Sequence, residues 1–308
     1  MRKYDREKVV NKVELQTFLD YLRNEKKTAA NTVEAYRRDL EAFSAFLQNR
    51  GIYALTNGSN TDVVAYMMEL KSSGKSKATV SRKLSSLRSF YKFMQKQNLI
   101  KENPTEDIRA PRIEKRELVY LTIEEVEQLL TTPDDSIKGI RDRAMLEVLY
   151  ATGIRVSEII ELKLSDVNLR MGFITLNGEH GRARIVPMGT IARKTLDRYI
   201  LESRSALLKG KDDCNPEGIL FVNYMGEPFS RQGFWKILKQ YGRQAGLEDR
   251  ITPHILRTSF AVHMVQNGAD LKSLQELMGH EDIMATQIYL SVTKNRIKDV
   301  YDKTHPRA

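Results

Sequence analysis

The sequence contains very little cysteine and no long apolar segment. Cys214 is the single cysteine among 308 residues, which excludes an internal disulfide framework and a cysteine-based zinc cluster. No apolar run approaches the roughly 20 residues that a membrane-spanning helix needs. The N-terminal stretch MRKYDREKVV contains no apolar signal core. We therefore expect a cytoplasmic protein that has no membrane partner.

The histidines lack the spacing of a metal site. No HxxxH pair and no surrounding cluster of carboxylates is found at His180, His254, His263, His280 and His305. Protein metal sites usually gather imidazole, thiolate or carboxylate ligands in such clusters. We therefore expect no metal.

Acidic residues are absent from one long basic segment. Between Lys71 and Lys101 there are nine Lys or Arg residues and no Asp or Glu. Residues 1–113 carry 22 Lys and Arg against 13 Asp and Glu, a net charge of +9, whereas the remainder carries 28 against 27, a net charge of +1. The formal net charge of +10 is thus concentrated in the first third of the chain. Such an asymmetry indicates a domain that holds nucleic acid.

The apolar residues of the first third repeat at helical spacing. Residues 11–49 contain two such patterns, residues 61–70 a shorter one and residues 75–97 a fourth. Thr32 is expected to cap the second helix, because its hydroxyl can accept a hydrogen bond from the first turn. We assign residues 1–108 to an N-terminal helical domain.

A linker and a second domain are expected to follow. Residues 109–117 are charged, extended and contain proline, which is typical of a linker. Within residues 118–308 the helical patterns are interrupted by residues 173–176 and 184–186, which alternate like the strands of a hairpin. Residues 219–222 are expected to add a short strand. The length of each part fits the roughly 100–200 residues of one domain.

The helix expected over residues 75–97 has an apolar stripe and a basic side. The stripe consists of Val80, Leu84, Leu87, Tyr91 and Met94. The basic side allows two interpretations: a solvated charged face, or a face that lies on DNA, whose phosphates favour it through counterion release. Hydroxyl groups between the charges add hydrogen-bond partners. The candidate DNA contacts of this domain are Arg37, Lys77, Thr79, Ser81, Arg82, Lys83 and Arg88.

Several side chains outside this domain suit the chemistry of a phosphodiester. His254 and Arg257 are three residues apart, so on a helix they share one face. Arg155 and His280 each follow a glycine-containing turn, and Tyr289 lies in a short run with a helical pattern. Guanidinium groups can clamp phosphate oxygens, imidazoles can move protons, and a tyrosine hydroxyl can be a covalent nucleophile.

In sequence order these residues resemble a known signature. The tyrosine recombinases carry the same residue types in the same order as Arg155, His254, Arg257, Gly279, His280 and Tyr289. The resemblance covers essentially the whole chain and favours the Xer subgroup, including the terminal residues HPRA. It implies a mainly α fold with a small antiparallel β-sheet. A SAM-like helical core-binding domain and a tyrosine-recombinase catalytic domain would then close around DNA.

The resemblance also implies how the site works. Arg155 and Arg257 would bind the scissile phosphate. Tyr289 would attack it and leave a 3′-phosphotyrosyl link and a free 5′ hydroxyl. His254 would act as acid and base, and His280 would donate a hydrogen bond to the phosphate. No metal and no other cofactor would be required.

Residues around the site take supporting roles in the same comparison. Glu158 would help to orient Arg155. Arg231 and Gln232, at the start of a predicted helix, would approach the DNA bases. Trp235 in that helix is expected to pack in the core.

The resemblance extends to the partners. The family members act on double-stranded DNA as homo- or hetero-tetramers that hold two sites, and the C-terminal tail docks on a neighbouring subunit. A tail that packs on its own domain is the alternative. A DNA translocase is a further candidate partner, as an activator.

One position departs from the family pattern. Xer-like proteins carry, in the hairpin turn, a lysine that acts as general acid for the leaving 5′ oxygen, and ungapped counting from both sides places Glu179 there. Arg182 and Arg184 are nearby, and Arg182 is a candidate DNA contact, but a guanidinium does not release its proton readily. Either a neighbour replaces the lysine, or His254 does more of the work, or cleavage is impaired.

Three functions follow from these observations. The first is site-specific recombination that resolves chromosome dimers at a dif-like site. The absence of an extra arm-binding domain favours this role over that of a mobile-element integrase. The second is a catalytically impaired DNA-binding relative, which Glu179 keeps in consideration. The third, a metal-dependent nuclease, is disfavoured by the histidine spacing.

Overall fold

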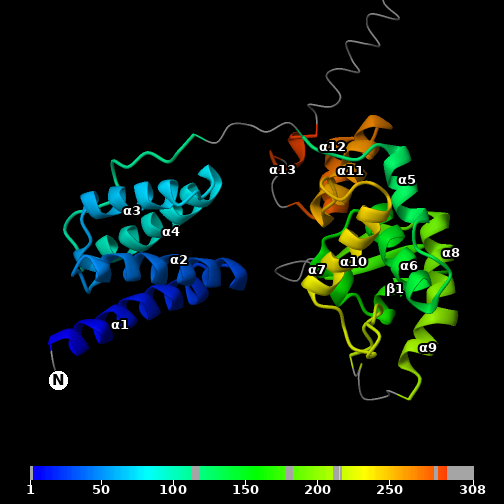
Figure 1. Ribbon diagram of the computed structural model, residues 1–308, viewed down its shortest axis with the longest axis horizontal. Helices are drawn as coiled ribbons and strands as arrows, with labels where there is room; N and C mark the ends of the chain where they lie inside the picture. Colours follow the sequence, from blue (N-terminus) through cyan, green and yellow to red (C-terminus); the bar gives the residue numbers. More distant parts are fainter. Residues whose placement is uncertain are drawn as a thin grey trace, which may run out of the picture. The chain divides into compact units, whose positions relative to one another are not determined.

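The protein consists of two compact units. The computed structural model describes residues 3–112, 118–177, 183–210, 215, 217–280 and 284–289, with side chains from residue 13 onward. Unit 1 is Met1–Arg116 and unit 2 is Glu117–Ala308 (Figure 1). Among the described residues no helix is both long and apolar enough to cross a lipid bilayer.

Four α-helices make up most of the described part of unit 1. They are α1 (Lys3–Asn24), α2 (Ala30–Asn49), α3 (Asn60–Ser72) and α4 (Lys77–Lys96). Ser59 begins α3 through a capping box with Asp62, and the Ser76 hydroxyl accepts the Thr79 N–H at the start of α4. The predicted cap at Thr32 is wrong. The N-cap of α2 is Ala29, three residues before Thr32, and it offers no side-chain acceptor.

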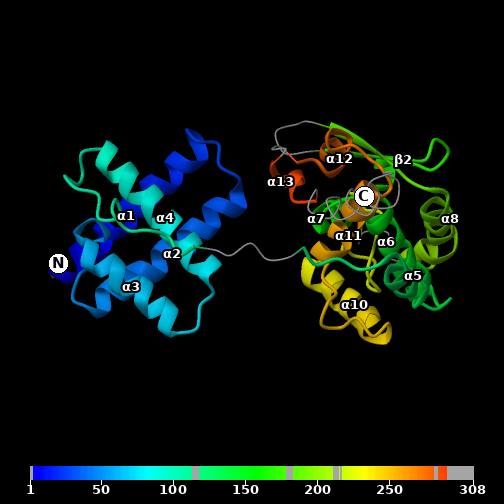
Figure 2. The same cartoon turned by 90° about the horizontal axis from the view of Figure 1, so that it is seen from above.

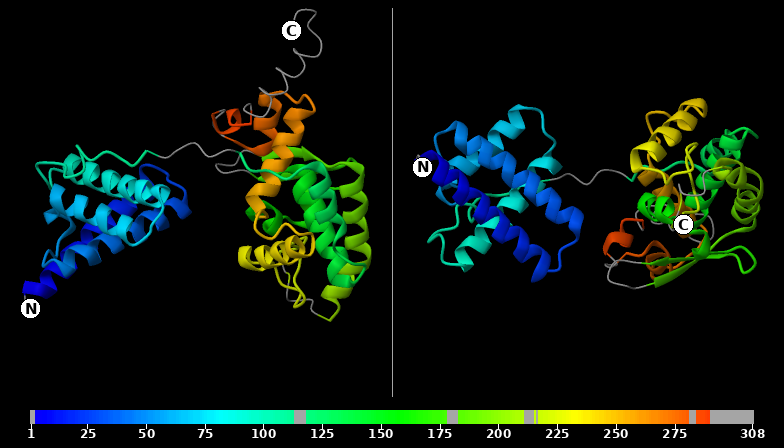
Figure 3. Two further views of the ribbon diagram at one scale, coloured as in Figure 1. Left: turned by 45° about the horizontal axis from the view of Figure 1, so that its top comes forward. Right: turned by 90° about the horizontal axis from the view of Figure 1, so that it is seen from below.

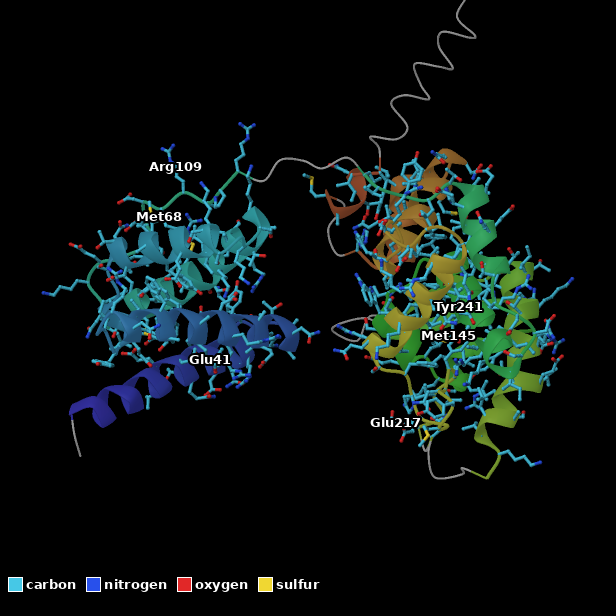
Figure 4. The ribbon with its side chains drawn as sticks, viewed as in Figure 1. Glu41, Met68, Arg109, Met145, Glu217 and Tyr241 are labelled. Atoms are coloured by element: carbon cyan, nitrogen blue, oxygen red, sulfur yellow. The ribbon has the colours of Figure 1, made fainter. Side chains whose placement is uncertain are left out.

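The core of unit 1 is rich in aromatic side chains. Phe18, Phe43, Phe90 and Tyr91 are fully buried, and the Tyr91 hydroxyl donates to the Leu55 carbonyl at 2.7 Å. The predicted apolar stripe of α4 is confirmed, since each of its five residues is buried. Each such side chain contributes about 1.5–3 kcal/mol through burial. On α3, Met68 is exposed to solvent (Figure 4).

Unit 2 is mainly helical. Its helices are α5 (Ile123–Thr131), α6 (Ile137–Thr152), α7 (Val156–Glu161), α8 (Thr190–Arg198), α9 (Ser205–Leu208), α10 (Arg231–Gln244), α11 (Pro253–Gln266), α12 (Leu271–Met278) and α13 (Met284–Gln287). A π-helical stretch, Tyr199–Arg204, joins α8 to α9. The capping box of Thr122 and Glu125 at α5 is confirmed. The α6 and α8 helices lie side by side (Figure 3).

The core of unit 2 forms around α6. Residues on several sides of this helix are buried, including Met145 and Leu149. Tyr241 of α10 reaches into the same interior, where its hydroxyl donates to the Asp142 carboxylate at 3.0 Å (Figure 4). Trp235 on α10 is 47% exposed, so its expected core position is wrong. The Lys239 ammonium lies 5.5 Å from the Trp235 ring centroid.

A small antiparallel sheet completes unit 2. Its strands β1 (Val167–Asn168), β2 (Phe173–Asn177) and β3 (Ala183–Pro187) pair in sequence order. The predicted hairpin is therefore confirmed, with Leu176 opposite Arg184 and Ile174 opposite Val186. The β3 strand lies beside α12 (Figure 2). This contact brings the hairpin close to the residues that precede His280.

The expected strand over residues 219–222 is wrong. Ile219 and Val222 form only isolated bridges, with Lys163 and Pro228. The reason is that side chains donate hydrogen bonds to a backbone carbonyl of this segment. The Tyr199 hydroxyl and the Arg204 guanidinium donate to the Leu220 carbonyl, at 2.9 and 3.0 Å, so this carbonyl needs no strand partner, while the Leu220 N–H donates to the Leu162 carbonyl at 2.7 Å.

Candidate active site

A glycine turn places Arg155 beside Arg257. Gly153 ends α6 in the left-handed conformation with φ +60°, and a Cβ there would lie 2.1 Å from a ring carbon of Phe260. Only glycine fits both requirements. The Gly153 carbonyl accepts a hydrogen bond from the Arg257 guanidinium, and Arg155 follows two residues later as the N-cap of α7.

Arg155 is held in place through both its backbone N–H and its guanidinium group. Its backbone N–H donates to Oε2 of Glu158 at 2.6 Å, and its Nη1 lies 3.3 Å from Oε1 of the same carboxylate. Its Nη2 donates to the Gly279 carbonyl at 2.8 Å. The side chain nevertheless stays 45% exposed. Arg155 can therefore accept an external anion without leaving its position.

Glu158 contacts a second arginine. Nη1 and Nη2 of Arg184 donate to its two oxygens at 2.8 and 3.0 Å. Burial by itself raises the pKa of Glu158, but the hydrogen bonds and charges of Arg184 and Arg155 outweigh burial, so the pKa lies below its ordinary value. The expected pairing of Glu158 with Arg155 is present in the structure.

Arg257 is almost completely enclosed. Its side chain, on α11, donates to the carbonyls of Gly153 and Met278, the latter at 2.6 Å. Burial, and then the charge of Arg155, lower the pKa of Arg257 to about 10. The group remains a cation at neutral pH. A buried cation whose acceptors are backbone carbonyls favours an anionic ligand, because its charge is not neutralised by them.

His280 is neutral and bridges Arg257 to α13. Its Nε2 lies 3.3 Å from Nη2 of Arg257, and its Nδ1 lies 2.9 Å from the Thr286 hydroxyl. Because a guanidinium can only donate, Nε2 must accept, and Nδ1 then carries the proton that is donated to Thr286. Burial, followed by the charge of Arg257, lowers the pKa of His280 to about 4.

The Tyr289 side chain is buried within the protein. Its side chain is 2% exposed and is hydrogen-bonded to Thr258 on α11, and its backbone N–H donates to the Thr286 carbonyl at 3.1 Å. Burial raises the pKa of Tyr289, while the charge of Arg257 and the Thr258 hydroxyl act in the opposite direction. The phenol is thus protonated at neutral pH and lies in the field of a guanidinium.

Positive charge dominates the electrostatics of this site. Arg155, Arg184 and Arg257 all act on His280. Glu158 is bonded to two of these arginines, Arg155 and Arg184. The balance suits a phosphodiester, whose negative charge grows when a nucleophile attacks it. Among the described residues, no group of three or more His, Cys, Asp and Glu could hold a metal ion.

Comparisons with known proteins match both units. Residues 119–296 match the model of the phage integrase family, and residues 15–98 match the model of the phage integrase N-terminal SAM-like domain. Tyrosine recombinase XerD of Oceanobacillus iheyensis is 43% identical over 96% of this chain and 98% of its own length. Tyrosine recombinase XerD of Listeria innocua is also 43% identical, over 96% and 99% of the two chains.

This chain belongs to the phage integrase family of tyrosine recombinases. It is a site-specific recombinase, as the residue signature indicated. The crystal structure of XerA recombinase aligns with a TM-score of 0.54 at 25% identity, covering 96% of this chain and 99% of that chain. XerH bound to palindromic difH substrate aligns with a TM-score of 0.74 at 22% identity, over 93% and 82% of the chains, and supports the same fold.

Several predicted site residues of the recombinase converge. Hydrogen bonds link Arg155, Glu158, Arg257 and His280 to one another or to the Gly279 turn. His254 is exposed on the first turn of α11, and its charge acts on His280. Glu179, Arg182 and the tail after Tyr289 lie outside the described residues, so their expected roles stay predictions.

The candidate DNA contacts of the recombinase are partly paired within the protein. In unit 1, Arg82 and Lys83 both donate to Asp39, a carboxylate that is 3% exposed. Arg37 is bonded to Glu34 and Glu41. These ion pairs leave room for DNA, because an arginine has five donors.

The remaining candidate DNA contacts lie in α4 of unit 1 and in α10 of unit 2. Arg88 of α4 donates to the Ile108 carbonyl, while Lys77, Thr79 and Ser81 lie on its first turns. Arg231 and Gln232 are exposed at the start of α10. Their contacts with DNA stay predictions.

Three side chains of the site have no role in the sequence prediction. They are Thr286, which holds His280, Thr258, which is bonded to Tyr289, and Arg184, which holds Glu158. A signal for Arg184 exists in the strand pattern. Along β3, Arg184 and Val186 face inward, while Ile185 between them is 64% exposed. A charged residue on the inward face of a strand indicates a buried partner.

Proposed function

We propose that the recombinase cuts and rejoins double-stranded DNA through Tyr289. The phenol oxygen would attack the scissile phosphorus, forming an O–P bond to the 3′ side and releasing the 5′ oxygen, which takes up a proton. The 5′ hydroxyl of a partner strand would then attack the phosphotyrosine and restore the phenol. The bond energy is conserved in the covalent intermediate, so exchange needs no high-energy cofactor.

The observation that carries this proposal is the convergence of two arginines on one turn. Arg155 reaches the Gly279 carbonyl, and Arg257 reaches the carbonyl of Met278, one residue earlier. A phosphate seated beside this turn could receive donors from both guanidiniums. Such donors stabilise the charge that develops on the non-bridging oxygens.

The histidines take complementary roles in the proposal. Exposed His254, one helical turn before Arg257, would exchange protons with the reacting groups. His280 accepts from Arg257 while DNA is absent. An arriving phosphate would draw the Arg257 donor away from Nε2. The phosphate's negative charge would then favour a proton on Nε2 and thus a hydrogen bond from His280 to the phosphate.

Tyr289 would have to leave its buried position to react. With 2% of its surface exposed and its hydroxyl bonded to Thr258, the phenol is not presented to an external phosphate. DNA binding would therefore include a local rearrangement of the segment that carries Tyr289. Such a step keeps the nucleophile from reacting before a site is assembled.

The biological role that we propose is resolution of chromosome dimers at a dif-like site. Relatives named tyrosine recombinase XerD match almost the whole chain, and a solved relative, XerH, is described with its difH substrate. A homo- or hetero-tetramer would hold two DNA sites through tail exchange in the cytoplasm, with a DNA translocase as activator. Glu179 keeps a slow or catalytically impaired member of such a tetramer as the second candidate.

A covalent trap tests the proposed function. The bound sequence is first selected from a pool of random duplexes, and nicked duplexes with the nick at successive positions are then built on it. We expect the chain to become attached to DNA in the presence of a chelator. Tyr289→Phe should abolish the adduct but retain binding, whereas Tyr224→Phe, which removes an exposed tyrosine hydroxyl, should retain both.

Three outcomes would contradict the proposal. If the selection enriches no sequence, the chain does not bind DNA site-specifically. An adduct that persists in Tyr289→Phe would remove the assigned nucleophile. Cleavage that stops in chelator would favour a metal-dependent nuclease instead.

A further inference from the structure

Arg184 connects three parts of unit 2 that are far apart in the sequence. It lies on β3, directly after the hairpin turn, and faces Leu176 across the sheet. Its side chain is 14% exposed, as is that of its partner Glu158. An arginine is rarely buried to this extent unless its donors have defined acceptors.

Three Arg184 nitrogens have such acceptors. Nη1 and Nη2 donate to the two oxygens of Glu158 at 2.8 and 3.0 Å, and Nε donates to the Leu277 carbonyl at 3.0 Å. The bidentate pair fixes the plane of both groups, which a single-point contact would not do. Arg184 therefore links the hairpin to α7 and to the end of α12.

The Gly279 turn packs directly on this guanidinium. A Cβ at position 279 would lie 2.8 Å from Cζ of Arg184, and Gly279 also has φ +61°. Both the backbone conformation and the close approach therefore require glycine. The same turn presents its carbonyl to Arg155 and leads into His280.

We propose that Arg184 is a positioning residue for cleavage: by clamping Glu158, the Leu277 carbonyl and the Gly279 turn, it fixes the distance between Arg155 and His280. This inference rests on the proposed function. Glu158 aligns Arg155, and the Leu277–Gly279 backbone aligns His280, so Arg184 couples both phosphate-binding groups to the sheet. Arg184 itself does not touch the phosphate.

The geometry separates this role from two others. As a general acid Arg184 is unsuitable, because a guanidinium bonded to a carboxylate holds its proton firmly. As a direct phosphate contact it is disfavoured as well, because its side chain is only 14% exposed and three of its five donors are already bonded to Leu277 and Glu158. Its effect on catalysis must therefore pass through its neighbours.

The test measures the rate of covalent complex formation on the nicked duplex over a range of protein concentrations. Arg184→Gln should lower the rate at saturation by about 100-fold, the loss that a shift of roughly 1 Å in the site can cause. The protein concentration at half saturation should stay close to that of the unsubstituted chain. Arg184→Lys keeps the charge but not the bidentate geometry, and should have an intermediate rate.

Arg204→Gln is the matched control. Arg204 also donates to backbone carbonyls in unit 2, but its acceptors are Leu220 and Ile219, both at 3.0 Å, which are not site residues. We expect this variant to lower the thermal unfolding temperature without changing the saturated rate. If it slows cleavage as much as Arg184→Gln does, the effect is loss of stability and the inference fails.

A double-mutant cycle with Glu158 keeps the inference testable even if one variant is unstable. If Arg184 acts through Glu158, the double Glu158→Gln, Arg184→Gln variant should be no slower than the slower single variant. The inference is overturned if the rate losses of the two single variants add in full in the double variant. It is also overturned if Arg184→Gln leaves the rate of an active chain unchanged. An unsubstituted chain that forms no covalent complex overturns the proposed function as well.

Discussion

His280 is held neutral by its surroundings in the site. Its folded pKa of about 4 lies below the ordinary value of 6.5, first because of burial and then because of Arg257, Arg155 and Arg184. The folded chain therefore resists a proton that the unfolded chain accepts. The site favours neutral His280 at the expense of stability in acid.

This shift predicts a pH dependence of stability. The contribution of His280 is fully present above pH 6.5 and is lost as the pH falls toward about 4, because the unfolded chain binds the proton first. Urea titrations across this window should show a falling free energy of unfolding. His263, whose pKa burial also lowers, contributes in the same direction, so the comparison must be with His280→Gln.

In His280→Gln the free energy of unfolding should fall less steeply between pH 6.5 and about 4. The part of the pH dependence that comes from His263 should remain. Equal slopes in the two proteins would show that His280 is not held neutral by its neighbours. Below about pH 4.5 a further loss is expected from Glu158, whose pKa lies below that ordinary value. Its pairing with Arg184 is then removed by protonation.

Glu179 is the residue at which the chain departs from its family. An ionised carboxylate has no proton to give to the leaving 5′ oxygen, and its charge opposes the developing alkoxide. We therefore expect Glu179→Lys to raise the rate of covalent complex formation by about tenfold or more, since general acid catalysis is typically worth roughly 10²–10⁴-fold.

A duplex with a 5′-bridging sulfur provides the control for Glu179→Lys. A thiolate leaves without a proton, so this duplex should speed the unsubstituted chain and remove the advantage of the variant. A neutral or harmful Glu179→Lys, together with a crippling Arg182→Ala, would mean that the hairpin turn supplies its charge in another way.

At the scale of elements, α4 combines a buried apolar stripe with a basic side whose charge is partly neutralised by a buried carboxylate of α2. Asp39 of α2 accepts hydrogen bonds from Arg82 and Lys83 of α4, and from the Ser86 hydroxyl at 2.8 Å. The Lys83 side chain is 13% exposed, whereas that of Arg82 is 49% exposed. Arg82 is therefore the better candidate for binding a phosphate, and Asp39 fixes its direction.

This network changes how DNA binding by α4 should be tested. Replacing Arg82 and Lys83 together would leave a buried carboxylate without its cations, which costs about 3–5 kcal/mol of stability. Arg82→Ala alone should weaken binding to all duplexes and lower the slope of the salt dependence by about one unit for each phosphate that the helix no longer binds. Arg38→Ala, on exposed Arg38 of α2, is the matched control. Equal slopes for the two variants would exclude Arg82 from the DNA interface.

At the scale of the whole molecule, the chain divides its tasks between two units. Unit 1 carries most of the net positive charge, and unit 2 contains the groups proposed for catalysis. A basic unit that binds phosphates without sequence preference can bring a nearly neutral catalytic unit to DNA. We predict that a few positions such as Arg231 and Gln232 then read the DNA sequence.

Assembly is expected to depend on the end of the chain. Ile297, Val300 and Tyr301 are apolar positions in an otherwise charged segment, and a lone terminal helix would be marginal in water. Deleting residues 299–308 should leave binding by one subunit nearly intact but lower cooperative binding to a two-site duplex. Gel-shift titrations on one-site and two-site DNA measure both. Normal cooperativity would mean that the tail packs on its own subunit.

The sequence by itself determined the features that neighbours along the chain encode. The α4 stripe, the Thr122–Glu125 capping box and the 173–186 hairpin follow from residue type and spacing over a few positions. The order of Arg155, His254, Arg257, Gly279, His280 and Tyr289, with the resemblance along the rest of the chain, predicted the family, and the match to the phage integrase family confirms it.

Only the tertiary structure decided which distant groups meet. Arg184 is 26 residues from Glu158 and 93 from Leu277, and no local pattern specifies either partner. The same holds for exposed Trp235 and for residues 219–222, where side chains of another segment donate to the Leu220 carbonyl. Such contacts depend on how whole elements pack, and packing minimises a free energy to which residues from the entire unit contribute.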